Sequence, residues 1–247
     1  MIRTDIAAGI HYLEHARTNV YLVEDDDGVL LVDTGLPRSK GVLLDALNRI
    51  GRPVQDIRAV VLTHGHFDHV GTAEHLRSRY GIPVYCHPDD AHIAAHPYSY
   101  QRERSPFLYP LSYPRAIPGL LRMTAAGAVT VKGIRDTLPL TPEAATALPG
   151  SPLVVPTPGH TKGHCALHFP DRDSVISGDA LVTLDPYTGR PGPQVVARAA
   201  TADTATALRS LEALRSTAAR TVLPGHGFPW LAGVESAVSQ ALEVGGH

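Results

Sequence analysis

Short, largely apolar segments that lead directly into a histidine or an aspartate recur along this chain of 247 residues. Such runs, bounded by turn residues, are typical of strands that are buried in a sheet. Two further stretches, 42–50 and 204–217, carry apolar residues at helical spacing and predict helices. The chain therefore combines predicted strands with predicted helices, and polar side chains follow the strands. The strand segments are 29–32, 60–62, 153–156, 174–177 and 221–223.

The composition is that of a folded protein without extreme charge. Hydrophobic residues make up 43% of the sequence and charged residues 19%, which provides apolar surface for a core and gives no signature of disorder. A formal net charge of -2 argues against a dedicated binder of nucleic acid or of an acidic membrane. No apolar run approaches the ~18 residues of a membrane span, and no secretory signal is visible. Because two cysteines cannot form a disulfide framework, we expect a cytoplasmic protein.

The segment from about 90 to 151 differs from the rest because aromatic residues and prolines crowd together in it. Prolines at this density prevent one long helix or a central strand. We expect an irregular insertion that serves as a lid over a pocket, the alternative being an ordinary surface insertion. The aromatic residues concerned are Tyr98, Tyr100, Phe107, Tyr109 and Tyr113.

Four potential metal ligands follow the predicted strand 60–62, namely His64, His66, Asp68 and His69. Imidazole and carboxylate ligands together suit zinc, with iron or manganese as alternatives. Alternate residues of an extended segment point to the same side, so His64 and His66 share a side. Asp68 and His69 need a turn between them to converge. Four ligands so close in sequence suit two adjacent metal ions better than one.

Three more potential ligands, His160, Asp179 and His226, each follow a predicted strand. Each of the two histidines stands beside a glycine, which allows the backbone to turn sharply or to approach a ligand closely. A carboxylate at the end of its strand, such as that of Asp179, is a natural bridge between two cations. Together with the run that begins at His64, these residues predict a metal centre.

These motifs resemble those of the metallo-β-lactamase superfamily. The matching segments occur in the family's order, at 32–35, 63–69, 159–161, 177–179 and 225–227. The resemblance implies an α/β fold, the αβ/βα four-layer sandwich, with the metal site at its edge. It also implies one domain over residues 1–247, with the insertion at about 90–151.

The resemblance further implies how the ligands are shared between two ions, and that Asp33 supports them from behind. His64, His66 and His160 bind one ion, Asp68, His69 and His226 bind the other, and Asp179 bridges the two.

A centre of two zinc ions predicts a hydrolase. The ions lower the pKa of a bound water toward ~7, and the resulting hydroxide attacks a carbonyl that one ion polarises. Asp68 is the predicted catalytic residue, which orients the nucleophile and helps to move its proton, and Tyr187 is a candidate proton donor to the leaving group. The expected substrate is a small molecule that contains an ester, thioester, lactone or amide.

Two other functions remain open. A persulfide dioxygenase of the same fold resembles this chain in its motifs, but it uses a single iron ion and oxygen. The second alternative is a catalytically silent protein whose metal centre serves to bind a partner or ligand. Neither a nucleic acid nor a membrane is expected as a partner, whereas a homo-oligomer is compatible with the aromatic insertion.

Overall fold

Two structural units, each assembled from two separate stretches of the chain, make up the computed structural model, which describes residues 1–247. The first unit comprises Met1–Ser99 and Met123–Leu153, and the second comprises Tyr100–Arg122 and Val154–His247. The chain therefore passes between the units three times. That the whole chain forms a single domain stays a prediction.

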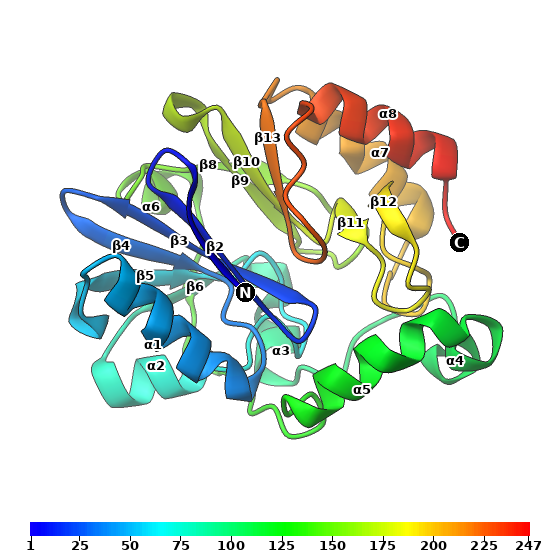
Figure 1. The fold of residues 1–247 in the computed structure, drawn as a ribbon, viewed down its shortest axis with the longest axis horizontal. Helices are drawn as coiled ribbons and strands as arrows, with labels where there is room; N and C mark the ends of the chain where they lie inside the picture. Colours follow the sequence, from blue (N-terminus) through cyan, green and yellow to red (C-terminus); the bar gives the residue numbers. More distant parts are fainter. The chain divides into compact units, whose positions relative to one another are not determined.

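A seven-stranded sheet forms the core of the first unit, and its strands lie in the order of the sequence (Figure 1). Neighbouring strands are antiparallel from β1 to β4 and parallel from β4 to β7. Every residue of β4 is buried, as expected for a central apolar strand. The strands are β1 (Ile2–Ala7), β2 (Ile10–His15), β3 (Thr18–Asp25), β4 (Gly28–Val32), β5 (Ile57–Val61), β6 (Val84–Cys86) and β7 (Leu138–Pro139).

Helices α1 and α2 lie on one side of this sheet (Figure 1). Helix α1 (Lys40–Arg49) buries Leu43, Ala46 and Leu47, which recur at the helical spacing that the sequence shows. Helix α2 (Ala73–Tyr80) ends at a glycine with a φ of 71°, a left-handed conformation that suits glycine. The shorter helices α3 (Ala91–Ala95) and α6 (Pro142–Thr146) also belong to this unit.

The second unit contains a four-stranded sheet in the order β13-β10-β9-β8. Strands β9 and β10 are antiparallel, whereas β10 and β13 are parallel. Buried side chains of α7 and α8, among them Leu211 and Val238, share a cluster with Val175 and Val222 of the sheet. The elements are β8 (Leu153–Pro156), β9 (Cys165–Phe169), β10 (Ser174–Gly178), β13 (Thr221–Pro224), α7 (Thr204–Arg215), α8 (Val234–Val244), α4 (Tyr109–Ser112) and the paired strands β11 (Val182–Leu184) and β12 (Pro191–Gln194).

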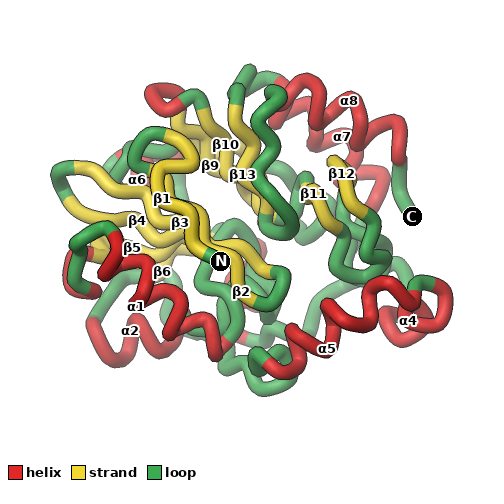
Figure 2. Tube along the Cα trace, viewed as in Figure 1, coloured by secondary structure: helices red, strands yellow, loops and turns green.

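The proline-rich segment 90–151 contains short helices and the two-residue edge strand β7, separated by loops (Figure 2). The longest of them is α5 (Ile117–Ala125). The predicted absence of one long helix or central strand is therefore confirmed, because the prolines repeatedly interrupt the backbone hydrogen bonding. Phe107 and Leu111 are 82% and 84% exposed. That the segment acts as a lid stays a prediction.

The structure also describes the two cysteines and the length and apolar character of the helices. Cys86 and Cys165 are buried residues of β6 and β9 and form no disulfide. Among the helices, none has both the length and the apolar character needed to cross a membrane.

Candidate metal centre

In the first unit, four of the predicted ligands occupy the loop that follows β5. His64, His66, Asp68 and His69 are each at most 5% exposed. The ring centroid of His64 lies 4.7 Å from that of His66 and 4.1 Å from that of His69. Oδ2 of Asp68 lies 3.9 Å from Nε2 of His69. The loop therefore gathers these four side chains into one buried cluster, as the sequence predicts.

The carboxylate of Asp33, directly after β4, orients this cluster. Oδ1 accepts a hydrogen bond from the backbone N–H of Thr63, and Oδ2 accepts one from the Thr63 hydroxyl, both at 2.8 Å. Oδ2 also lies 2.8 Å from Nδ1 of His69. A carboxylate accepts hydrogen bonds, so Nδ1 of His69 carries the proton. The resemblance implied this position for Asp33, and the structure shows the contact.

The same network determines which nitrogen of His64 carries its proton. The Thr63 hydroxyl has one proton and donates it to Asp33, so at 3.0 Å it accepts from Nδ1 of His64. In both His64 and His69 the proton is therefore on Nδ1, which leaves the lone pair on Nε2 for a metal ion.

Backbone contacts hold the loop in place. The backbone N–H and the hydroxyl of Thr34 both donate to the carbonyl oxygen of His69, at 2.8 Å. The N–H of Gly65 donates to the buried carboxylate of Asp90 at 3.0 Å. A Cβ at Gly65 would lie 2.6 Å from the backbone nitrogen of Ala94, so no larger residue fits there without a shift. The glycine between the first two histidines is thus required by close packing.

In the second unit, Asp179 lies between the other two predicted histidines. Its Oδ2 is 3.4 Å from Nε2 of His160 and 3.2 Å from Nε2 of His226. All three residues are at most 3% exposed. Asp179 follows β10 and His226 follows β13, which are parallel neighbours, so both strands deliver their ligands to the same end of the sheet.

The chemistry of these three side chains fits a cation. The Thr201 hydroxyl donates to the carbonyl oxygen of Val196 at 2.7 Å, so it accepts from Nδ1 of His160, 3.3 Å away. A neutral His160 then turns a lone pair on Nε2 toward the Asp179 carboxylate. Two acceptors at such a distance repel each other unless a proton or a metal ion lies close to both. Buried imidazole and carboxylate ligands are those that zinc and iron prefer.

His164 also belongs to this site, although the sequence analysis did not predict it as a site residue. Its Nε2 accepts a hydrogen bond from the backbone N–H of Asp179 at 3.0 Å, and its Nδ1 lies 2.8 Å from the Thr157 hydroxyl. His164 therefore holds the backbone at Asp179. The only signal in the sequence was its proximity to His160, because the partner on the next strand is far away along the chain.

The side chain of Tyr187, a candidate proton donor, packs in an aromatic cluster of the second unit. Its ring centroid lies 6.1 Å from that of Tyr109 in an edge-to-face arrangement, and Ala197 and Ala199 complete the cluster. The catalytic role of Tyr187 stays a prediction. The structure thus gathers four predicted ligands in one unit and three in the other, and their binding of common ions also stays a prediction.

A family model described as the metallo-beta-lactamase superfamily matches residues 15–226. The "Probable metallo-hydrolase YflN" of Bacillus subtilis (strain 168) is 29% identical over 91% of this chain and 86% of that protein. The hydroxyacylglutathione hydrolase of Cereibacter sphaeroides (strain ATCC 17023) is 31% identical over 58% of this chain and 40% of that enzyme.

Among solved structures, TTHA1623 in a di-iron-bound form has a TM-score of 0.63 with 29% identity, over 91% of this chain and 95% of that chain. These similarities and the mixed sheets and helices confirm the expected α/β fold.

Proposed function

The chain belongs to the metallo-β-lactamase superfamily and is a metallo-hydrolase, and on this premise we propose that it uses two metal ions to cleave a small carbonyl compound. The proposed substrates are esters, thioesters, lactones and amides. The similarity to a hydroxyacylglutathione hydrolase supports including thioesters, although the match covers 40% of that enzyme. The proposal rests on three hydrogen bonds. Nδ1 of His64, His69 and His160 each donates to an oxygen of the protein, which leaves Nε2 of each ring for a metal ion.

The proposed ligand sets follow the family's motifs. Asp179 is the proposed bridge, and its position between two imidazoles supports that role. We assign His64, His66 and His160 to one ion, and Asp68, His69 and His226 to the other.

The metal ions, when bound, supply an ionised water at neutral pH and polarise the substrate carbonyl. The protein side chains supply orientation and proton transfer. Asp33 fixes the ring of His69 and, through Thr63, that of His64. Asp68 is the proposed acceptor of the proton that leaves the attacking water, because its buried carboxylate lies beside His69.

Zinc is the proposed metal, and the di-iron form of TTHA1623 supports iron as the alternative. Metal analysis of protein purified without added zinc decides between them. Two equivalents of zinc are expected. A single equivalent of iron, together with oxygen uptake on glutathione persulfide, would instead support the dioxygenase function.

The experiment that tests the hydrolase is His66→Ala, with His92→Ala as the matched control because His92 is an exposed histidine of the same unit. Metal content and turnover are measured on a panel of esters, thioesters, lactones and amides. We expect both quantities to fall in His66→Ala and to stay unchanged in the control. Full turnover without metal would refute the proposal, and full metal occupancy without turnover on any panel member would support a silent binding protein.

A further inference from the structure

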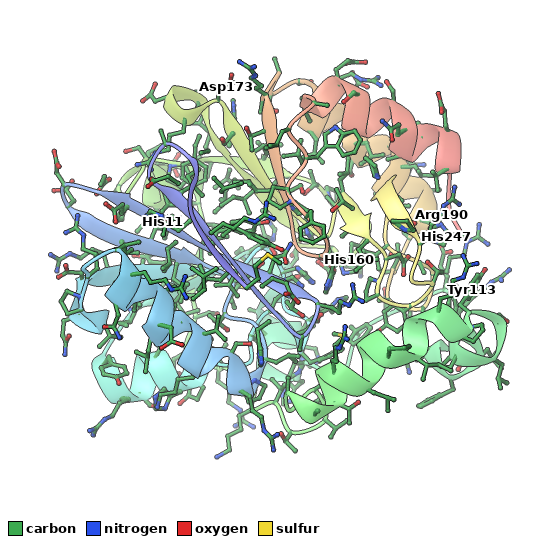
Figure 3. The ribbon with its side chains drawn as sticks, viewed as in Figure 1. His11, Tyr113, His160, Asp173, Arg190 and His247 are labelled. Atoms are coloured by element: carbon green, nitrogen blue, oxygen red, sulfur yellow. The ribbon has the colours of Figure 1, made fainter.

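A separate pocket of about 400 Å³ opens in the second unit, and none of the predicted metal ligands lines it. Two segments, 112–115 and 188–191, form its walls together with His247. The side chains of Tyr113, Arg190 and His247 gather there at one edge of the unit (Figure 3). A volume of this size falls within the range of small-molecule sites.

The buried carboxylate of Asp185 holds the backbone and one side chain at the pocket in place. Asp185 is fully buried, and its Oδ1 accepts hydrogen bonds from the backbone N–H groups of Tyr187 and Thr188 at 2.7 and 3.0 Å. Its Oδ2 accepts from the N–H of Ala197 at 2.7 Å and lies 3.0 Å from Nε2 of His247. One side chain thus ties the turn after β11 to the imidazole that lines the pocket.

The two walls are in close contact at Gly189. This residue has a φ of 69°, and a Cβ there would lie 3.1 Å from the carbonyl carbon of Arg115. The close approach brings the backbone of Arg115 against the turn that carries Arg190. Two arginines that are distant in sequence therefore belong to one pocket.

Arg115 and Arg190 bring two guanidinium groups to the pocket lining. No aspartate or glutamate lines it, and neither Arg115 nor Arg190 has an ion pair with another side chain of the protein. Guanidinium groups bind carboxylate and phosphate oxygens through paired, charge-assisted hydrogen bonds. The lining is therefore suited to an anionic group.

Tyr113 and two prolines give the lining its apolar surface. The ring of Tyr113 stacks on that of Tyr109, with centroids 5.5 Å apart and an interplanar angle of 29°. Burial raises the pKa of Tyr109, so its hydroxyl keeps the proton that it donates to the carbonyl oxygen of His247 at 3.3 Å. Pro114 and Pro191 add apolar surface with little conformational freedom.

We propose that this pocket binds a small organic anion. A carboxylate or phosphate group contacts Arg115 and Arg190, and a flat apolar body packs against Tyr113 and the two prolines. The assignment goes beyond the proposed hydrolase, since it concerns a second site and does not depend on metal chemistry.

The test measures binding to the metal-loaded, full-length protein by isothermal titration calorimetry. The probes are benzoate, phenyl phosphate and benzyl alcohol, which share a ring and differ in the polar group. The test variant is Arg115→Gln/Arg190→Gln, and the control is Arg220→Gln, which removes the charge of another exposed arginine of the same unit. All three arginines are exposed, so we expect every variant to fold.

We expect benzoate or phenyl phosphate to bind, and the stronger of the two identifies the preferred head group. Affinity should fall about tenfold or more in the double variant and stay unchanged in the control. Three results would overturn the proposal: no binding of either anion, equal binding of benzyl alcohol, or unchanged affinity in the double variant. An anion that binds at the metal centre instead of in this pocket would keep its affinity in the double variant. Its binding would instead be lost in His66→Ala.

Discussion

Asp33 and His69, which are 36 positions apart in sequence, are joined by a hydrogen bond of 2.8 Å between Oδ2 and Nδ1. This contact links the end of β4 to the loop after β5, and the Thr63 hydroxyl extends it to His64. The bond determines which nitrogen of His69 faces a metal ion. Asp33 has a φ of 60°, a left-handed conformation that aspartate tolerates better than most side chains.

Asp33→Asn should weaken metal binding and turnover by about 10–100-fold, because an amide nitrogen replaces one of the two carboxylate acceptors. Asp45→Asn is the matched control, since Asp45 is an exposed residue of α1. Metal affinity by competition with a chelator and kcat on the best substrate are the measurements. An Asn variant with normal metal affinity would exclude the positioning role of Asp33.

His164→Ala should lower kcat about tenfold with little change in KM, because the backbone N–H of Asp179 loses its buried acceptor. His164→Gln should restore part of kcat, since an amide oxygen also accepts a hydrogen bond. His168→Ala is the control on the adjoining strand. Equal kcat values for the Gln and Ala variants would argue for a purely structural role.

Removal of metal should destabilise the folded protein. A ligand present at 100–1,000 times its Kd contributes about 3–4 kcal/mol to the free energy of unfolding, provided that only the folded state binds it. We expect chelation to lower Tm by several degrees and zinc to restore it. The same treatment should leave Tm of His66→Ala nearly unchanged. An identical shift in both proteins would mean that the stabilising ion binds elsewhere.

Gly159→Ala should destabilise the protein by about 2–5 kcal/mol, because the residue has a φ of 129° and a Cβ there would overlap with the backbone of Ala207. Gly41→Ala provides the opposite case. Gly41 lies in α1, where a Cβ meets nothing, so alanine should stabilise by about 0.5–1 kcal/mol. Urea denaturation measures both effects, and a neutral Gly159→Ala would contradict the packing at this position.

Burial lowers the pKa of His168 below its ordinary value of 6.5. Between the two pKa values the unfolded chain binds more protons than the folded chain, so the free energy of unfolding falls as pH decreases through this window. His168→Gln should flatten this part of the pH dependence. Denaturant midpoints measured across the window test the sign.

Where apolar spacing is strong, the sequence predicted the elements well. Residues 42–50 and 204–217 correspond to α1 and α7, and 153–156 corresponds to β8. Strand β1 was missed, because Arg3, Thr4 and Asp5 are exposed and give no apolar run. Backbone pairing with β2 maintains it instead, and pairing is invisible in a single segment.

The candidate site, too, could be predicted from the sequence only in part. All seven predicted ligands are buried, since their residue types and spacing carry the chemistry. The role of His164 depends on a hydrogen bond to the backbone of Asp179, just after another strand, and residue type does not encode such a contact. The pocket at Arg115 and Arg190 depends on a turn that packs against a distant segment, and a single sequence does not show which distant segments meet.

The interleaved construction of the two units has a consequence for biosynthesis. The first unit needs residues up to Leu153, while the stretch 100–122 of the second unit emerges from the ribosome before that point. The residues against which that stretch packs in the second unit are translated only after residue 153. Until those later residues have been translated, the nascent chain exposes Tyr109 and Ala116, which are buried in the complete chain, and a chaperone that binds apolar segments can act at this stage.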